Sequence, residues 1–376
     1  MTVTAVIRPD SVDALCSVIR DAADRGQTLR LRGGGSKDAI GAPTPDAQPV
    51  DLRGFSGVVD YDPPELVLTV GAGTPLSEVL ALVAEQRQML AFDPFDHGAM
   101  LGGEPGQATI GGVVAAGVAG PLRLSCGGAR DHLLGFTAVS GRGERFVAGA
   151  KVVKNVTGYD LPKLLAGSWG RLAALTEVTL KVLPAPQVRR TLAVRGLDPA
   201  AAVAAMARAL GSAAEVSAAA HLPDAEGGPL TAIRIDGFPS SVDARAKLLG
   251  TLIQGIQPCD GDPWQAIATA APLPAEMPLW RLIVAPSRAP EVVANIPGSW
   301  LFDWGGAMVW LASGADPAAV RAAAEQAGGH ALLVRADAEV RARVPARHPQ
   351  PPAAAALEER VRRAFDPFGV FETGRF

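Results

Sequence analysis

Cysteine is scarce in this chain. Its 376 residues include only Cys16, Cys126 and Cys259, and no two of these form a Cys-x-x-Cys pair. An odd number of widely spaced cysteines excludes a disulfide framework, and it excludes an iron–sulfur or structural zinc site built within the chain. We therefore expect no metal site, and a reducing cytoplasm as the location.

Long hydrophobic runs and an excess of one charge are also missing. No uninterrupted apolar segment reaches the roughly twenty residues of a membrane span, and the first ten residues lack the pattern of a secretion signal. With 35 basic and 38 acidic residues, the net charge is −3. Nucleic acid and anionic membranes demand a basic face, so neither is expected as a main partner. Any association with a membrane would come through partner proteins.

Both common nucleotide-binding fingerprints are absent. The stretch Arg32–Lys37, RGGGSK, lacks the spacing of a P-loop, and no Gly-x-Gly-x-x-Gly follows a strand and opens a helix. Gly71-Ala72-Gly73 comes nearest, but it stops short of a third glycine. Thr74 and Pro75 instead predict the cap and the first residue of a helix.

Glycine, in contrast, is abundant and clustered. Gly33, Gly34 and Gly35 follow a predicted strand at 29–32 and are flanked by Arg32 and Lys37. Consecutive glycines let the backbone turn with positive φ and direct several N–H groups toward one anion. The pattern predicts a phosphate cradle, and a plain turn is the alternative.

Two further glycine clusters lie downstream, at 109–120 and at 158–170. Small apolar residues between these glycines allow a flat ligand or a second backbone to approach closely. One extended ligand would be able to touch all three clusters.

The order of these motifs resembles the FAD-binding domain of the vanillyl-alcohol oxidase and p-cresol methylhydroxylase superfamily. The motifs in order are RGGGSK, ATIGGVVAAGVAGP, GGARDHLLGF and KVVKNVTGYDLPKLLAGSWGRLAALTEVTLKV. The phrase KNVTGYDLPKLLAGSWG and the tail AFDPFGVFETGRF resemble the FAD-binding E subunits of bacterial glycolate oxidases.

This resemblance implies a cofactor, FAD, and the residues that hold it. The glycine loop would carry the pyrophosphate; its residues are Arg32, Gly33, Gly34, Gly35, Ser36 and Lys37. The second cluster would line the ribityl chain and flavin, through Thr109, Ile110, Gly111, Gly112, Gly117 and Gly120. The third would hold the adenosine side, through Gly158, Asp160, Gly167 and Gly170. Arg130 and Asp131 form a further candidate pair, with a surface ion pair as the alternative reading.

The resemblance also bears on how the flavin is held. Ser36 and Lys37 stand where relatives with covalent FAD have a histidine, so we expect non-covalent FAD. The resemblance implies that Glu372 and Arg375 of the tail also bind the cofactor, and Glu372 stands where many relatives place an asparagine near the flavin ring. A carboxylate there would disfavour the anionic reduced flavin unless it were paired, for which Arg375 and Arg281 are candidates.

No catalytic base can be assigned. The histidines, which would be the usual choice for a 2-hydroxy acid, are scattered singly: His97, His132, His221, His330 and His348. None forms the paired-histidine constellation of the substrate-oxidising relatives. This puts independent substrate oxidation by the chain in doubt.

An α+β fold is expected, with a two-subdomain p-cresol methylhydroxylase-type FAD-binding domain over 1–185. A ferredoxin-like antiparallel cap would follow over 186–345, and 346–376 would return to the first domain. Residues 343–356 read as a linker before a last helix at 357–365. Tryptophans of the cap are expected in its core or, alternatively, at an interface: Trp280, Trp300, Trp304 and Trp310.

By this resemblance the chain is an FAD-binding subunit of a 2-hydroxy-acid (glycolate) dehydrogenase or oxidase complex. Its partners would be a catalytic flavoprotein subunit and an iron–sulfur subunit, with a small 2-hydroxy acid as the substrate of the complex. Two alternatives remain open. One is a self-sufficient FAD-dependent 2-hydroxy-acid oxidoreductase, and the other is a flavin-free scaffold subunit.

Overall fold

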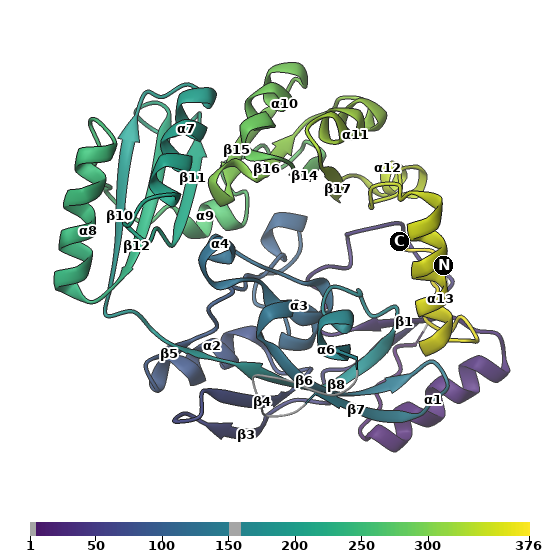
Figure 1. The fold of residues 1–376 in the computed structure, drawn as a ribbon. Helices are drawn as coiled ribbons and strands as arrows, with labels where there is room; N and C mark the ends of the chain where they lie inside the picture. The colour runs from purple at the N-terminus through teal and green to yellow at the C-terminus, as the bar shows by residue number, and fades with distance from the viewer. Residues whose placement is uncertain (1–4, 150–158) are drawn as a thin grey trace. The chain divides into compact units, whose positions relative to one another are not determined.

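A computed structural model describes residues 5–149 and 159–376. Its contacts divide the chain into two compact units, coloured by residue number in Figure 1. Unit 1 consists of Met1–Ala119, Gly127–Ala185 and Pro349–Phe376, and unit 2 consists of Gly120–Cys126 and Pro186–His348.

Unit 1 contains a five-stranded antiparallel sheet in the order β3-β4-β8-β6-β7 and two smaller pairs of strands. The strands of the main sheet are β3 (Val58–Asp62), β4 (Val67–Gly71), β6 (Leu133–Ser140), β7 (Arg145–Gly149) and β8 (Ala173–Lys181). The smaller pairs are β1 (Leu29–Arg32) with β2 (Gln48–Asp51), which is parallel, and β5 (Gln88–Met89) with β9 (Leu183–Pro184).

The helices of unit 1 are short except at its two ends. They are α1 (Val12–Asp24), α2 (Leu76–Glu85), α3 (Ile110–Ala116), α5 (Ala129–His132), α6 (Leu161–Leu165) and α13 (Pro352–Phe365), with the 3-10 turn η1 (Ala99–Leu101). Ser11 caps α1 by accepting the N–H of Ala14, and Gly26 follows the helix with φ of +62°. Leu15 and Ile19 bury its apolar face.

Unit 2 is built on an eight-stranded sheet whose neighbouring strands are all antiparallel. In sheet order these are β13 (Gln257–Pro258), β10 (Val188–Arg195), β12 (Leu230–Gly237), β11 (Ala218–Leu222), β15 (Ser299–Asp303), β16 (Met308–Ala312), β14 (Leu279–Ile283) and β17 (His330–Arg335). Its helical elements are α4 (Arg123–Cys126), α7 (Pro199–Leu210), α8 (Pro239–Leu252), α9 (Trp264–Ala268), η2 (Pro286–Arg288), α10 (Ala289–Asn295), η3 (Trp304–Gly306), α11 (Pro317–Gln326) and α12 (Ala338–Arg343). The expected α+β class is confirmed.

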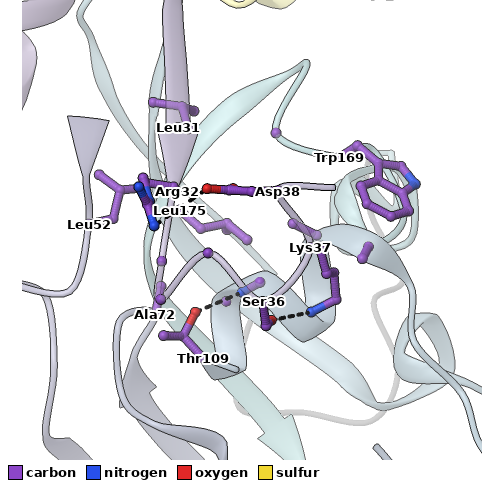
Figure 2. Close-up of a pocket in the computed structure, with 18 of the residues that line it drawn as sticks. Leu31, Arg32, Ser36, Lys37, Asp38, Leu52, Ala72, Thr109, Trp169 and Leu175 are labelled. Atoms are coloured by element: carbon purple, nitrogen blue, oxygen red, sulfur yellow. Dashed lines mark hydrogen bonds and ion pairs between the residues drawn. The ribbon is translucent and has the colours of Figure 1, made fainter. Parts of the chain in front are cut away.

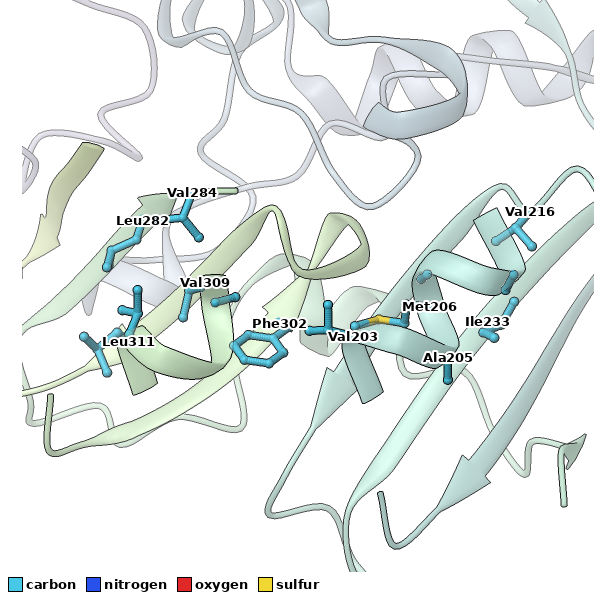
Figure 3. Close-up of a cluster of buried hydrophobic side chains, with 14 of the residues drawn as sticks. Val203, Ala205, Met206, Val216, Ile233, Leu282, Val284, Phe302, Val309 and Leu311 are labelled. Carbon is cyan, nitrogen blue, oxygen red and sulfur yellow. The ribbon is translucent and has the colours of Figure 1, made fainter. Parts of the chain in front are cut away.

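The core of unit 2 lies between one face of this sheet and the helices α7, α8, α10 and α11. Figure 3 shows strand residues such as Leu282, Val309 and Phe302 among helix residues such as Val203 and Met206. Since side chains alternate across a strand, the residues between these core positions lie on the opposite face of the sheet.

Some local predictions were wrong. The helix α2 begins at Leu76 with Pro75 as its N-cap, and Thr74 makes no cap bond. The Thr74 hydroxyl instead donates to the carbonyl of Gly71 (2.7 Å) and accepts the N–H of Gly57 (3.0 Å). The Thr74 hydroxyl thus links two turns instead of capping α2, because its partners at Gly71 and Gly57 use its hydrogen bonds.

Two segments rich in glycine, proline or alanine contain helices. The glycine-rich stretch 91–120 includes α3, which Thr109 caps by accepting the N–H of Gly112. The expected linker at 343–356 overlaps α12 and the first turn of α13, which begins five residues before the predicted helix at 357. Among the described residues, no helix is both long and apolar enough to cross a bilayer.

Candidate cofactor site

The glycine loop after β1 and the helix α3 line one open cavity in unit 1, shown in Figure 2. Its volume is about 740 Å³, including the solvent at its mouth. The predicted residues that line it are Arg32, Gly33, Gly34, Gly35, Ser36, Lys37, Thr109, Gly111, Gly112, Gly170 and Arg375. Residues from all three glycine clusters and the tail therefore meet at one cavity.

Two of the glycines are needed because the loops touch. A Cβ on Gly33 would lie 2.2 Å from the Thr109 hydroxyl oxygen, and a Cβ on Gly34 would lie 1.9 Å from the carbonyl oxygen of Gln107. Either distance is far below van der Waals contact, so only glycine permits this approach. The glycine loop is therefore held against the loop that leads into α3.

The glycine loop leaves a row of backbone donors unused. Among the hydrogen bonds of the described residues, the N–H groups of 33–37 donate to no acceptor, whereas the next one, of Asp38, bonds to Gly35. Gly35 has φ of +85°, a conformation that places successive N–H groups on one side of a turn. Such a nest of donors suits a phosphate oxygen.

Lys37 supplies positive charge inside the cavity. It is 9 % exposed, and its Nζ has only a long contact of 3.5 Å to the Ser36 hydroxyl. Burial lowers the pKa of Lys37 to about 8, with the charge of Asp96 opposing this and that of Arg375 adding to it. A poorly solvated ammonium without a close carboxylate suits an anionic ligand.

Arg32 is arranged differently. Its Nη2 lies 3.4 Å from a carboxylate oxygen of Asp38, which also lies 3.8 Å from Arg30 Nη1. These ion pairs neutralise part of the charge at one rim of the cavity, where Figure 2 shows Arg32 beside Asp38. Among the described residues, Arg32 is thus ion-paired whereas Lys37 is not.

Several lining residues were missed by the sequence reasoning, which looked for glycines and charges. They are Leu31, Asp38, Leu52, Ala72, Ala115, Ala116, Trp169, Ala173 and Leu175. Most come from strands or helices whose inward faces carry no chemical signature. Trp169 could have been predicted, because it lies between the predicted residues Gly167 and Gly170.

Trp169 forms one wall together with the end of the chain. It has φ of +58°, unusual for a large side chain, and its N–H donates to the carbonyl of Ala115 (2.7 Å). Its ring centroid lies 4.8 Å from that of Phe376, and the Arg375 guanidinium lies 5.8 Å from the Trp169 ring. The tail and the third glycine cluster therefore meet at this aromatic wall.

Other predicted residues do not line the cavity. Ile110 is fully buried at the start of α3, and Gly117 packs against Gly167, whose Cα would lie 3.2 Å from a Cβ on Gly117. Asp160 caps α6 by accepting the N–H of Lys163, and Asp131 accepts the N–H of Gly128. These residues shape the elements around the cavity.

Three further residues predicted to bind the cofactor are Arg130, Gly120 and Gly158. Arg130 lies in α5 and acts electrostatically on Asp160, whose pKa is lowered first by its hydrogen bond to Lys163. Gly120 belongs to unit 2, where its carbonyl accepts the indole N–H of Trp304 (3.0 Å). Gly158 falls outside the described residues.

Glu372 does not have the partners expected for it. Its carboxylate pairs with Arg171 (3.2 Å) and with Arg362, and it lines a smaller neighbouring cavity. Burial raises the pKa of Glu372, but the hydrogen bonds and charges of these two arginines outweigh burial, so its pKa lies below the ordinary value. The expected pairing with Arg375 or Arg281 was wrong, because α13 brings Arg362 to the tail.

None of the histidines lines the cavity. His97 stacks on Phe95 with ring centroids 4.6 Å apart, and buried His132 lies 3.3 Å from the carbonyl of Lys181. Among the described residues, the titratable groups that line the cavity are Arg32, Lys37, Asp38 and Arg375.

Comparison with known proteins agrees with this geometry. The model of a family described as FAD binding domain matches residues 3–149. Over 371 residues, the chain is 34% identical to glycolate oxidase subunit GlcE of Escherichia coli (strain K12), covering 97% of both chains. This chain belongs to the GlcE family.

More distant relatives place the family in a wider group. Glycolate oxidase subunit GlcD of Bacillus subtilis (strain 168) is 28% identical over 189 residues, covering 50% of this chain and 38% of GlcD. The crystal structure of p-cresol methylhydroxylase with substrate bound has a TM-score of 0.69 at 13% identity, covering 98% of this chain and 88% of the other. The GlcE-family chain is thus an FAD-binding oxidoreductase-family protein with the expected fold.

Proposed function

We propose that this chain binds FAD non-covalently in the cavity of unit 1 and serves as a flavin subunit of a glycolate oxidase complex. The observation that carries the proposal is the row of unused N–H donors at 33–37 beside the buried ammonium of Lys37. A pyrophosphate offers acceptor oxygens and negative charge to both.

The remaining wall residues suit the other parts of the same molecule. Leu31, Leu52 and Leu175 make part of the cavity apolar, as a flat ring system requires, and Trp169 offers an aromatic face. Relatives with covalently attached FAD have a histidine in the glycine loop. This chain has Ser36 and Lys37 at that position. The absence of a histidine at this loop position supports non-covalent binding.

Within the complex, the bound FAD would accept or pass on electrons, because flavins carry out both one- and two-electron chemistry. The protein's contribution is to hold the cofactor by the glycine loop and to keep Lys37 near its phosphates. No histidine base lines the cavity among the described residues. We therefore assign substrate oxidation to a catalytic flavoprotein partner, and onward transfer to an iron–sulfur partner.

Flavin counting on the native assembly tests the proposal. The purified chain is expected to absorb at about 450 nm, as oxidised flavin does, and to release its flavin into the supernatant on acid precipitation. Yellow colour retained on the precipitated chain would contradict non-covalent binding. Glycolate turnover by the isolated chain with an artificial acceptor would contradict the assignment of substrate oxidation to a partner subunit.

We also propose that the assembly is cytoplasmic and that it reaches any membrane only through its partner subunits.

A further inference from the structure

The tail of unit 1, residues 370–376, begins beside the first strand of that unit and ends at the glycine loop. The carbonyl of Val370 accepts the N–H of Leu29, the first residue of β1 (2.7 Å). Val370 and Phe371 are buried in the core against which α1 packs, and the Asp366 carboxylate accepts both of their N–H groups (3.0 and 2.7 Å). The tail is therefore firmly anchored where it approaches the loop.

The side chain of Arg375 binds the main chain directly after the glycine loop. Its Nε donates to the carbonyl of Ile40 (2.7 Å), and its Nη2 donates to the carbonyl of Lys37. The carbonyl of Arg375 in turn accepts the N–H of Ala42 (3.0 Å). Hydrogen bonds from this one residue thus bracket the segment 37–42.

The bond to the Lys37 carbonyl acts on the peptide group that follows the donor row at 33–37. A peptide group is planar, so its carbonyl and its N–H point in opposite directions. The N–H of this peptide group, which belongs to Asp38, donates to the carbonyl of Gly35 (2.9 Å), while its carbonyl accepts from Arg375. With both polar atoms bound, the peptide group is held in one orientation, and so is the end of the donor row.

Packing holds Arg375 in this position. Its guanidinium lies 5.8 Å from the Trp169 ring and 5.1 Å from the Phe376 ring. A Cβ on Gly41, which has φ of +82°, would lie 2.6 Å from the Arg375 carbonyl oxygen and 2.8 Å from its Cγ. Only glycine lets the loop lie this close to the tail.

We propose that Arg375 is a positioning residue for FAD, which keeps the glycine loop in its phosphate-binding shape through the carbonyls of Lys37 and Ile40. The ammonium of Lys37 attracts the pyrophosphate, whereas the planar fork of Arg375 holds two acceptors in fixed directions. Such preorganisation raises affinity, because less of the loop has to be ordered on binding. This role rests on the proposed binding of FAD in unit 1, and Arg375 acts through the loop rather than on the phosphates themselves.

Titration of the full chain with FAD, followed by flavin fluorescence, tests this role. Arg375→Met should raise the Kd for FAD by about tenfold or more, because two hydrogen bonds from a charged donor are lost. Arg375→Lys keeps the charge but not the planar fork, and should raise the Kd by about fivefold or more. Arg363→Met is the matched control, since Arg363 is exposed and pairs along its own helix with Glu359. It should leave the Kd unchanged.

Gly41→Ala tests the same contact from the side of the loop. This variant keeps Arg375 and its charge, and Gly41 does not line the cavity. The new Cβ would push the tail away from the loop, so the Kd for FAD should rise by about fivefold or more. Gly26→Ala is its control, because Gly26 also has positive φ (+62°) but has no atom within 4 Å of the added Cβ. The control should lose stability without losing affinity for FAD.

Hydrogen exchange of the flavin-free chain separates positioning from general stability. In Arg375→Met, the amides of 38–42 should exchange about tenfold faster or more, whereas those of 133–140 in β6 should keep their native rates. Equally faster exchange in both segments would show that Arg375 supports the fold of unit 1 as a whole, and would overturn the positioning role. Unchanged exchange at 38–42 would overturn it as well.

The titration has its own contrary outcomes. Native affinity in Arg375→Met or Gly41→Ala would overturn the positioning role. Full rescue by Arg375→Lys would overturn it too, because charge rather than geometry would then be what Arg375 supplies. A native chain that binds no FAD would instead overturn the proposed function, and the positioning role with it.

Discussion

Lys37 is the residue on which the electrostatics of the proposed FAD site depend most. Its ammonium is buried in the cavity wall, and its pKa of about 8 lies close to physiological pH. Below pH 8 the group is charged and attracts phosphate, and above it the charge is lost. The same burial destabilises the ligand-free protein, because the charged form of Lys37 is poorly solvated.

Lys37→Met is therefore expected to weaken FAD binding by about tenfold or more at pH 7, measured by flavin fluorescence. FAD affinity of the native chain should fall as pH rises through 8, and this dependence should disappear in the variant. The ligand-free variant should be more stable at pH 7 by about 1–3 kcal/mol, since a buried charge is removed. Lys247→Met, at an exposed helix position, serves as the control and should change neither property.

Gly34 shows how a single hydrogen atom permits the loop contact. Gly34→Ala would bring a Cβ within 1.9 Å of the Gln107 carbonyl oxygen, so the two loops must separate. We expect a loss of about 1–3 kcal/mol in unfolding free energy and a large loss of bound flavin. Gly250→Ala in α8 meets no atom within 4 Å, and should instead stabilise by about 0.5–1 kcal/mol in urea unfolding.

His221 is a buried imidazole in the core of unit 2. Its Nδ1 lies 2.9 Å from the Thr231 hydroxyl, and the rings of Trp300 and Phe302 lie about it at 5.8 and 6.1 Å. Burial lowers the pKa of His221 to about 4, against an opposing influence from Asp198. The folded protein therefore holds this residue neutral where the unfolded chain would protonate it.

Neutral His221 makes the free energy of unfolding depend on pH. Its contribution to that free energy is fully present above pH 6.5 and is lost as pH falls toward 4, by up to roughly 3 kcal/mol. Urea unfolding of the native chain and of His221→Gln across this range measures the difference. Equal slopes in the two proteins would contradict the assignment.

At the scale of elements, the C-terminal segment completes unit 1. Arg375 donates through Nε to the carbonyl of Ile40 (2.7 Å) and through Nη2 to the carbonyl of Lys37. Arg171 pairs with Glu358 of α13 (2.6 Å) and with Glu372 of the tail. The tail thereby supports the glycine loop from behind, while Arg171 ties the tail to α13.

Arg171→Met should release this segment, because Glu358 and Glu372 both lose a largely buried partner. We expect a loss of about 1–3 kcal/mol in unfolding free energy and faster proteolysis after residue 349. Arg343→Met breaks an exposed pair within one helix and should cost less than about 1 kcal/mol. Equal free energies of unfolding in the two variants would show that the ion pairs of Arg171 with α13 and the tail do not stabilise the protein.

At the scale of the whole molecule, each unit has a hydrophobic core of its own. Ligands that bind one unit stabilise that unit by mass action, by about 2.7 kcal/mol at a hundredfold excess over Kd. FAD is expected to protect amides of 29–52 and 109–117 from hydrogen exchange and to leave amides of 279–283 and 308–312 unchanged. Equal protection of all four segments would contradict binding at the glycine loop.

Local pattern predicted much of this fold. The strand predicted at 29–32 is β1, and the last helix, predicted at 357–365, is the larger part of α13, which ends at Phe365. The order of the glycine motifs identified the family, now confirmed by the GlcE relative. The sequence also predicted that the three glycine clusters lie close together, since one extended ligand would touch all of them.

Contacts between distant segments were decided only by the tertiary structure. Sequence order does not show that Gly34 rests on Gln107, that Arg362 rather than Arg375 pairs with Glu372, or that Arg281 faces Trp310. Periodicity reports burial along one element, whereas these pairings depend on the register and packing between elements. The amino-acid sequence thus determined the elements and the cofactor class, while the packing between elements decided which charges are paired and which loops touch.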